Sequence, residues 1–102
     1  MQKEIKKQRV YMKKVFVLVE LYTFQFATDY RISIYSDRDK AAGAFNDRVK
    51  REKEDSWITT TPEDSLVESY SNENGKLEYD AYRNGESAEY ETTIVVLEKE
   101  VW

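Results

Sequence analysis

The sequence predicts an α+β domain with the element order β-β-α-β-β-β, in which one helix packs on a mostly antiparallel sheet of about five strands. Three features predict this fold. The run Val15–Val19 is continuously apolar and rich in β-branched residues, as in a strand covered on both faces. One amphipathic segment follows it in the middle of the chain. Two Asn-Gly dipeptides in the second half are typical of tight β-hairpins.

Composition favours one small intracellular domain. The 102 residues include 16 Lys plus Arg and 20 Asp plus Glu, for a net charge of −4, and 40% are apolar. That length supports a single core. With neither Cys nor His, the chain has no disulfide, no thiolate and no imidazole for catalysis or metal binding. No apolar run could span a bilayer and no signal-peptide pattern opens the chain, so we expect a cytoplasmic protein that needs no cofactor.

Charge differs between the two halves of the chain. Residues 1–51 carry a net charge of +6, and residues 52–102 carry −10. We interpret residues 1–11 as a basic N-terminal arm, frayed or marginally helical, because a short isolated helix is weak in water. Residues 12–102 then form the single domain. The basic side chains that could bind phosphates are Lys3, Lys6, Lys7, Arg9, Lys13 and Lys14.

The first half of the chain indicates a β-hairpin. Val15–Val19 begins the first strand, and alternating apolar and polar residues over 30–35 predict the second. The turn falls somewhere within residues 22–29, and residues 27–29 are plausible turn residues. Ile94–Leu97 is a second run that is apolar on both faces of the strand. Together with Val15–Val19, it predicts the two central strands of the sheet, which we expect to be neighbours.

A helix is predicted from about Asp37 to Lys53. Ser36 is the expected N-cap, and acidic residues in the first turn favour the positive end of the helix dipole. Gly43 lies inside the helix at a cost of about 1 kcal/mol, and we expect its small size to allow close approach to a strand. The apolar stripe that should face the sheet consists of Ala41, Phe45 and Val49.

The residues after the helix predict a core anchor and a short turn. Trp57-Ile58 is apolar and follows directly on the charged end of the helix. Thr61 as an N-cap and Pro62 as a first helical residue would open one short helical turn.

The C-terminal half predicts a meander of three strands. Asn74-Gly75 and Asn84-Gly85 both favour two-residue type I′ turns. Each turn would be flanked by opposite charges, which is the favourable cross-strand arrangement. The predicted strands are 66–73, 76–83 and 86–97.

This register stacks two sets of side chains on opposite faces. One face carries a tyrosine ladder of Tyr70, Tyr79 and Tyr90, continued by Ala81 opposite Ala88. The other face pairs Glu78 with Glu91 and Asp80 with Glu89. The resulting acidic block consists of Glu78, Asp80, Glu89 and Glu91, with Tyr82 alongside.

Each set has a structural and a functional interpretation. The ladder is either the core face that receives the helix or a platform on which nucleic-acid bases stack. The acidic block is either a solvated surface or a binding site for a cation-rich partner. Flat strands do not wrap a metal ion, so no metal site is predicted. Acid–base catalysis by a pair of carboxyl groups requires that the two groups have different pKa values, which exposed carboxyl groups lack. An enzyme of unknown class is therefore a distant alternative.

The apolar residues outnumber those that one helix can cover. We therefore expect a homodimer, or another protein docked on the surplus surface. The side chains assigned to that surplus are Phe16, Leu18, Tyr22, Phe24, Phe26 and Trp102.

Residues 12–53 resemble a class of small, uncharacterised bacterial and phage domains. The resemblance rests on Val15–Val19, Tyr30–Ser36 and the segment Ser36-Asp37-Arg38-Asp39-Lys40-Ala41. It implies a hairpin that runs into a helix, and it implies no activity. The acidic meander after Pro62 departs from that class.

The expected function is that of a non-enzymatic interaction protein. The acidic block would be presented to a basic protein surface, where it mimics nucleic-acid phosphates and inhibits a DNA- or RNA-binding partner. The resemblance implies a phage or mobile-element origin for such an inhibitor. The alternative is a nucleic-acid-binding protein that uses the basic arm.

Overall fold

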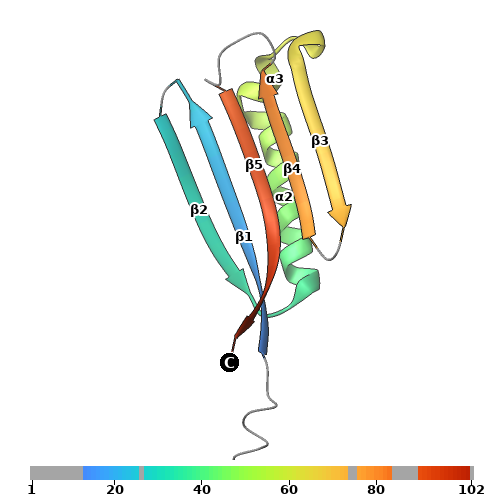
Figure 1. Ribbon diagram of the computed structural model, residues 1–102. Helices are drawn as coiled ribbons and strands as arrows, with labels where there is room; N and C mark the ends of the chain where they lie inside the picture. The colour runs from blue at the N-terminus through green and yellow to red at the C-terminus, as the bar shows by residue number, and fades with distance from the viewer. Residues whose placement is uncertain (1–12, 26, 74–75, 84–89, 102) are drawn as a thin grey trace, which may run out of the picture.

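The computed structural model is a five-stranded sheet with one long helix across one of its faces (Figure 1). The structure describes residues 13–25, 27–73, 76–83 and 90–101. The predicted α+β class and element order are confirmed, while the predicted arm, residues 1–11, lies outside the described residues. The elements are β1 (Lys13–Phe24), β2 (Ala27–Tyr35), α2 (Arg38–Asp55), α3 (Trp57–Thr60), the 3-10 turn η1 (Glu63–Ser65), β3 (Leu66–Glu73), β4 (Lys76–Arg83) and β5 (Tyr90–Val101).

The strands lie in the order β2-β1-β5-β4-β3, and every neighbouring pair is antiparallel. β1 and β5 are interior neighbours, as their doubly apolar runs predicted. The first hairpin turns directly after Phe24, where Gln25 has a φ of 47°. This turn falls within the expected window, but residues 27–29 belong to β2 and are not turn residues.

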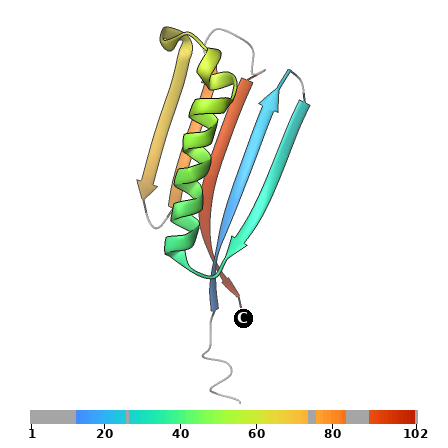
Figure 2. The same cartoon turned by 180° about the vertical axis from the view of Figure 1, so that it is seen from behind.

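The core lies between α2 and the sheet. The predicted stripe of Ala41, Phe45 and Val49 is buried. In Figure 2, α2 crosses the sheet over β4 and β5, while β2 stands clear of it. The sheet contributes Phe16 and Leu18 from β1, Tyr79 and Ala81 from β4, and Ile94 and Val96 from β5.

This core corrects the predicted surplus of apolar surface. Phe16 is 7% exposed and Leu18 is 1% exposed, so neither remains for a partner. Even-numbered residues of β1 face α2, because alternate residues of a strand point to opposite faces. Phe24 is half exposed, whereas Phe26 and Trp102 lie outside the described residues.

The helix begins one residue later than predicted. Asp37, and not Ser36, is the N-cap, and its side chain accepts a hydrogen bond of 2.8 Å from the Asp39 amide. Gly43 does not approach a strand, since a Cβ built there meets nothing within 4 Å. Packing against the described residues therefore does not require a glycine at this position.

The segment after α2 anchors the helix to the sheet, as predicted. Ile58 is 5% exposed, and the Trp57 indole donates a hydrogen bond of 3.0 Å to Thr92 Oγ1 on β5. Thr61 does not cap the next turn: its hydroxyl donates to the Trp57 carbonyl at 2.9 Å and thereby closes α3. Pro62 precedes η1 and is not its first residue.

The strand register is confirmed for one hairpin and wrong for the next. Tyr70 lies opposite Tyr79 and Glu73 opposite Lys76, as predicted. On the other side of β4, however, Tyr79 lies opposite Ile94, four residues beyond the predicted partner. The observed register buries Ile94 and Val96 under the helix. Burial of this apolar run outweighs the turn preference of the single dipeptide Asn84-Gly85.

Candidate functional site on the open face of the sheet

One face of the sheet is not covered by any element of the described chain. α2, α3 and η1 lie behind the sheet in the view of Figure 1 and in front of it in Figure 2. We call the uncovered side the open face. It receives the odd-numbered residues of β1 and β5 and the even-numbered residues of β2 and β4, because their strand neighbours occupy the core.

The chemistry of the open face changes between β5 and β4. Ile32, Val19 and Val95 lie side by side on β2, β1 and β5. The next residue across the sheet, on β4, is Glu78. We call the apolar part of this face the apolar stripe. It consists of Val15, Val17, Val19, Leu21, Tyr30, Ile32, Ile34, Val95, Leu97 and Val101.

Beside the apolar stripe lies an acidic strip, which we define as Glu78, Asp80 and Glu91 with Tyr82. The predicted pairs are wrong: Glu78 lies opposite Val95, Asp80 opposite Thr93, and Glu91 opposite Tyr82. The three carboxylates still share one face, because a shift of four residues preserves the alternation of a strand. Glu89, the fourth member of the predicted block, lies outside the described residues, as does the predicted partner Ala88.

The carboxyl groups of the strip influence each other. Partial burial and a hydrogen bond with Glu78 raise the pKa of Asp80, and the charge of Glu91 adds to the effect. The same hydrogen bond and the ammonium of Lys76 lower the pKa of Glu78. Lys76 Nζ is 3.0 Å from Glu78 Oε1, and Thr93 Oγ1 donates to Asp80 Oδ1 at 2.7 Å. The strip is therefore a line of like charges with one internal cation.

The strip does not form a metal centre. Over the described ranges, no three acidic side chains converge closely enough to hold a metal ion. The carboxylates follow one another along the strand and its neighbour, and that arrangement suits a row of cationic side chains better than one compact ion.

A second group of ionisable residues is buried, and the sequence interpretation missed it. Glu20 on β1 is fully buried, and its Oε1 accepts from the Tyr22 hydroxyl at 2.5 Å. Arg48 Nε, from α2, is 3.4 Å from the same oxygen. Glu20 Oε2 has no hydrogen-bond partner among the described residues. Burial also raises the pKa of the neighbouring Glu52.

A simple signal in the sequence points to this buried carboxylate. Glu20 has the same strand parity as Phe16 and Leu18, so it must face the helix if they do. A charge on a core position needs a partner, and Arg48 lies one residue before the buried Val49 on the helix that packs there. Glu20 is part of an internal ion pair with Arg48, to which the Tyr22 hydroxyl adds a hydrogen bond.

The structure describes only part of the basic surface that is the alternative binding site. Lys3, Lys6, Lys7 and Arg9 lie outside the described residues, whereas Lys13 and Lys14 are exposed at the start of β1. Lys14 Nζ is 3.2 Å from Glu98 Oε2, and the two neighbours Lys14 and Arg38 hold the pKa of Glu98 below its usual range. On α2, Arg48 turns inward to Glu20, whereas Lys50 and Arg51 are exposed.

The predicted tyrosine ladder does not form, and only Tyr79 belongs to the core. Tyr79 is fully buried, and its ring centroid lies 5.1 Å from that of the exposed Tyr70. Tyr90 packs instead against Phe24 and Trp57. The interpretation as a base-stacking platform is therefore wrong, since the central ring is inaccessible and the third is not aligned with it.

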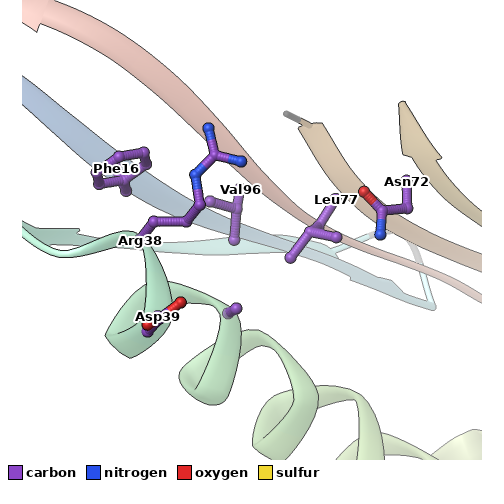
Figure 3. Close-up of a pocket in the computed structure, with 7 residues that line it drawn as sticks. Phe16, Arg38, Asp39, Asn72, Leu77 and Val96 are labelled. Atoms are coloured by element: carbon purple, nitrogen blue, oxygen red, sulfur yellow. The ribbon is translucent and has the colours of Figure 1, made fainter. Parts of the chain in front are cut away.

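A small pocket lies between the start of α2 and the sheet (Figure 3). It measures about 180 Å³ and is lined by apolar side chains of the core edge together with Arg38, Asp39 and Asn72. The Arg38 guanidinium is already engaged, 5.5 Å from the Phe16 ring centroid and 2.6 Å from Glu98 Oε1. The pocket is smaller than typical ligand sites of 300–1,000 Å³.

Comparisons with protein-family models, curated proteins and solved structures find no match for this chain. Over the part of the chain that the structure describes, no helix combines the length and the apolar character needed to cross a membrane.

Proposed function

We propose that the protein is a non-enzymatic interaction module that binds a basic protein surface through the acidic strip. The observation that carries this proposal is the position of Glu78, Asp80 and Glu91 together on the one sheet face that no described element covers. A solvated surface without a partner would gain nothing from a line of neighbouring carboxylates, because their like charges repel one another.

A cationic partner removes that repulsion. Partial burial, together with the neighbouring Glu78, raises the pKa of Asp80 and so disfavours its ionised form. A Lys or Arg side chain placed between the two carboxylates reverses this effect and forms charge-assisted hydrogen bonds. Tyr82, which is 45% exposed, adds an aromatic face next to the acids that suits a guanidinium.

The natural target of such a surface is a protein that otherwise binds nucleic acid. Its Lys and Arg side chains are arranged to meet a row of phosphates, and the acidic strip offers a row of carboxylates in their place. In this role the module competes with DNA or RNA for the partner, as an inhibitor does.

The test uses an arginine-rich peptide and amide chemical shifts measured by NMR. We expect peptide-induced shifts at Glu78, Asp80, Tyr82 and Glu91 that weaken as salt is added. The triple variant Glu78→Gln, Asp80→Asn, Glu91→Gln keeps the shapes of the side chains and should abolish the shifts.

A matched control distinguishes the strip from general acidity. Glu54→Gln, Glu63→Gln and Asp64→Asn together remove three exposed charges elsewhere on the molecule, and this variant should bind the peptide as the wild type does. Equal losses in both variants, or no shifts at low salt, would refute the proposal. A DNA oligonucleotide that instead shifts Lys13 and Lys14 would favour the basic arm as the functional surface.

A further inference from the structure

The apolar stripe of the open face is unusually exposed for the surface of a small protein. Tyr30 is 67% exposed, Ile32 54% and Ile34 68%, and Leu21 on the neighbouring strand is 42% exposed. These side chains point away from α2, which covers only the opposite face of the sheet (Figure 2). Contiguous apolar patches of this kind mark interaction sites.

The stripe carries no negative charge. On the open face, three neighbouring stretches of the described β2, β1 and β5 are apolar. They are the open-face residues within Tyr30–Ile34, Val15–Leu21 and Val95–Leu97. The carboxylates of this face lie beside these residues, at Glu78 and Asp80 on β4 and at Glu91 near the start of β5. A surface without charge cannot attract a charged partner, so its occupant must be apolar as well.

The size of the stripe fits a pair of identical chains. Five of the stripe side chains are 42–68% exposed and the other five are partly buried, and together they offer on the order of 500 Å² of apolar surface. A standard interface covers about 800 Å² on each partner and is roughly 60% apolar, which corresponds to the same apolar area. The stripe on its own therefore reaches the size of a stable interface.

The boundary with the acidic strip determines how two copies fit together. If β4 lay over β4 of the partner, the carboxylates of Glu78 and Asp80 would face their own copies about 10 Å away. If a twofold axis runs along β1, the β2 strand of each chain faces β5 of the other. Glu78 and Asp80 on β4 then project on opposite sides of the pair. Glu91 on β5 faces β2 of the partner, whose open-face residues carry no acidic group.

We propose that a second copy of this chain occupies the apolar stripe, with the two sheets packed face to face around β1 and with Glu78 and Asp80 of each chain left free. The interface is isologous, as in most homodimers, and the two sheets align at about −30°. This pairing does not depend on the proposed binding of a basic partner, because the two surfaces share no residue.

The test measures molecular mass by sedimentation velocity over a range of protein concentrations. The wild type should sediment at twice the 12.1 kDa chain mass at micromolar concentration. Ile34→Asp places a charge in the stripe and should raise the dimer dissociation constant at least tenfold. Since Ile34 is 68% exposed, the fold should persist, which a circular dichroism spectrum checks. Ile32→Asp, one rung further along β2, should act in the same way.

Two further variants make the test specific. Ser33→Asp adds the same charge to the same edge strand on its other face, and it should leave the dissociation constant within twofold of wild type. The triple variant of the acidic strip should also leave it unchanged. A wild type that stays monomeric at high micromolar concentration overturns the proposal. Equal weakening by Ser33→Asp would indicate pairing at the β2 edge, and a tighter dimer in the strip variant would indicate stacked acidic strips; either outcome overturns it.

Discussion

At the scale of single residues, Glu20 shows how one side chain can depart from the pattern of its strand. It is a carboxylate at a position whose neighbours Phe16 and Leu18 form the core, and it is fully buried. Tyr22 and Arg48 both bind its Oε1. The charge is retained in the core because a hydrogen bond and a cation offset its desolvation.

We predict that Arg48→Met lowers the free energy of unfolding by about 3 kcal/mol, because it leaves the buried charge of Glu20 without a cation. Urea unfolding measures the change. Arg51→Met, an exposed arginine of the same helix, should cost less than about 0.5 kcal/mol. Adding Glu20→Leu to Arg48→Met should recover most of the loss, and a double variant as unstable as the single one would contradict this account.

A second prediction concerns the pH dependence of the acidic strip. The pKa of Asp80 is raised above its usual value of 3.8, so the folded chain holds this proton more tightly than the unfolded chain does. The contribution of Asp80 to stability is thus greatest in acid and is lost as the pH rises through that pKa. Asp80→Asn keeps the acceptor for Thr93 and should stabilise the protein at pH 7 by about 0.5 kcal/mol after solvent screening.

The gain from Asp80→Asn should shrink as the pH falls through the raised pKa of Asp80, because the protonated carboxyl group resembles an asparagine. Urea unfolding at several pH values tests this. The exposed Asp64→Asn serves as the control and should not show the same trend. A gain that is constant over this range would mean that Glu78 and Asp80 do not influence each other.

At the scale of elements, local signals predicted well where one segment sufficed. The stripe of α2 and the hairpin at Asn74-Gly75 rest on neighbouring residues, and both are confirmed. The β4–β5 register was predicted from the equally strong turn preference of Asn84-Gly85. It is wrong, because the observed register buries Ile94 under the helix. Contacts between distant segments override a two-residue turn preference.

Gly43 provides the prediction at this scale. It is an exposed position in the interior of α2, and a Cβ there meets no atom within 4 Å. Gly43→Ala should therefore stabilise the helix by up to about 1 kcal/mol through lower backbone entropy of the unfolded chain. Thermal unfolding should show a rise in Tm of about 4–8 °C. A fall in Tm would mean that the position makes a contact that only glycine allows.

At the scale of the whole molecule, the sheet is covered on one side only. One helix of 18 residues packs over the middle of a five-stranded sheet, and the other face carries the apolar stripe beside the acidic strip. The predicted surplus of apolar surface named two residues wrongly. Phe16 and Leu18 are covered by α2, and Ile32 and Ile34 are exposed in their place.

Pairing through the stripe couples stability to protein concentration. Because the paired state contains only folded chains, a tenfold increase in concentration should raise Tm by about 2–4 °C. Differential scanning calorimetry at two concentrations measures the shift. Ile34→Asp should remove this dependence and Ser33→Asp should keep it, whereas a wild-type Tm that is independent of concentration would count against the pairing.

Much of this molecule follows from short stretches of sequence. Alternation, apolar runs, capping residues and the first Asn-Gly turn specify the elements, their order and the sharing of a sheet face by Glu78 and Asp80, because these properties depend on residues close together in the chain. The partner of each strand across the sheet, the side that α2 covers and the burial of Glu20 depend on which distant apolar groups exclude water together. That competition involves the whole chain at once, and only the three-dimensional packing resolves it.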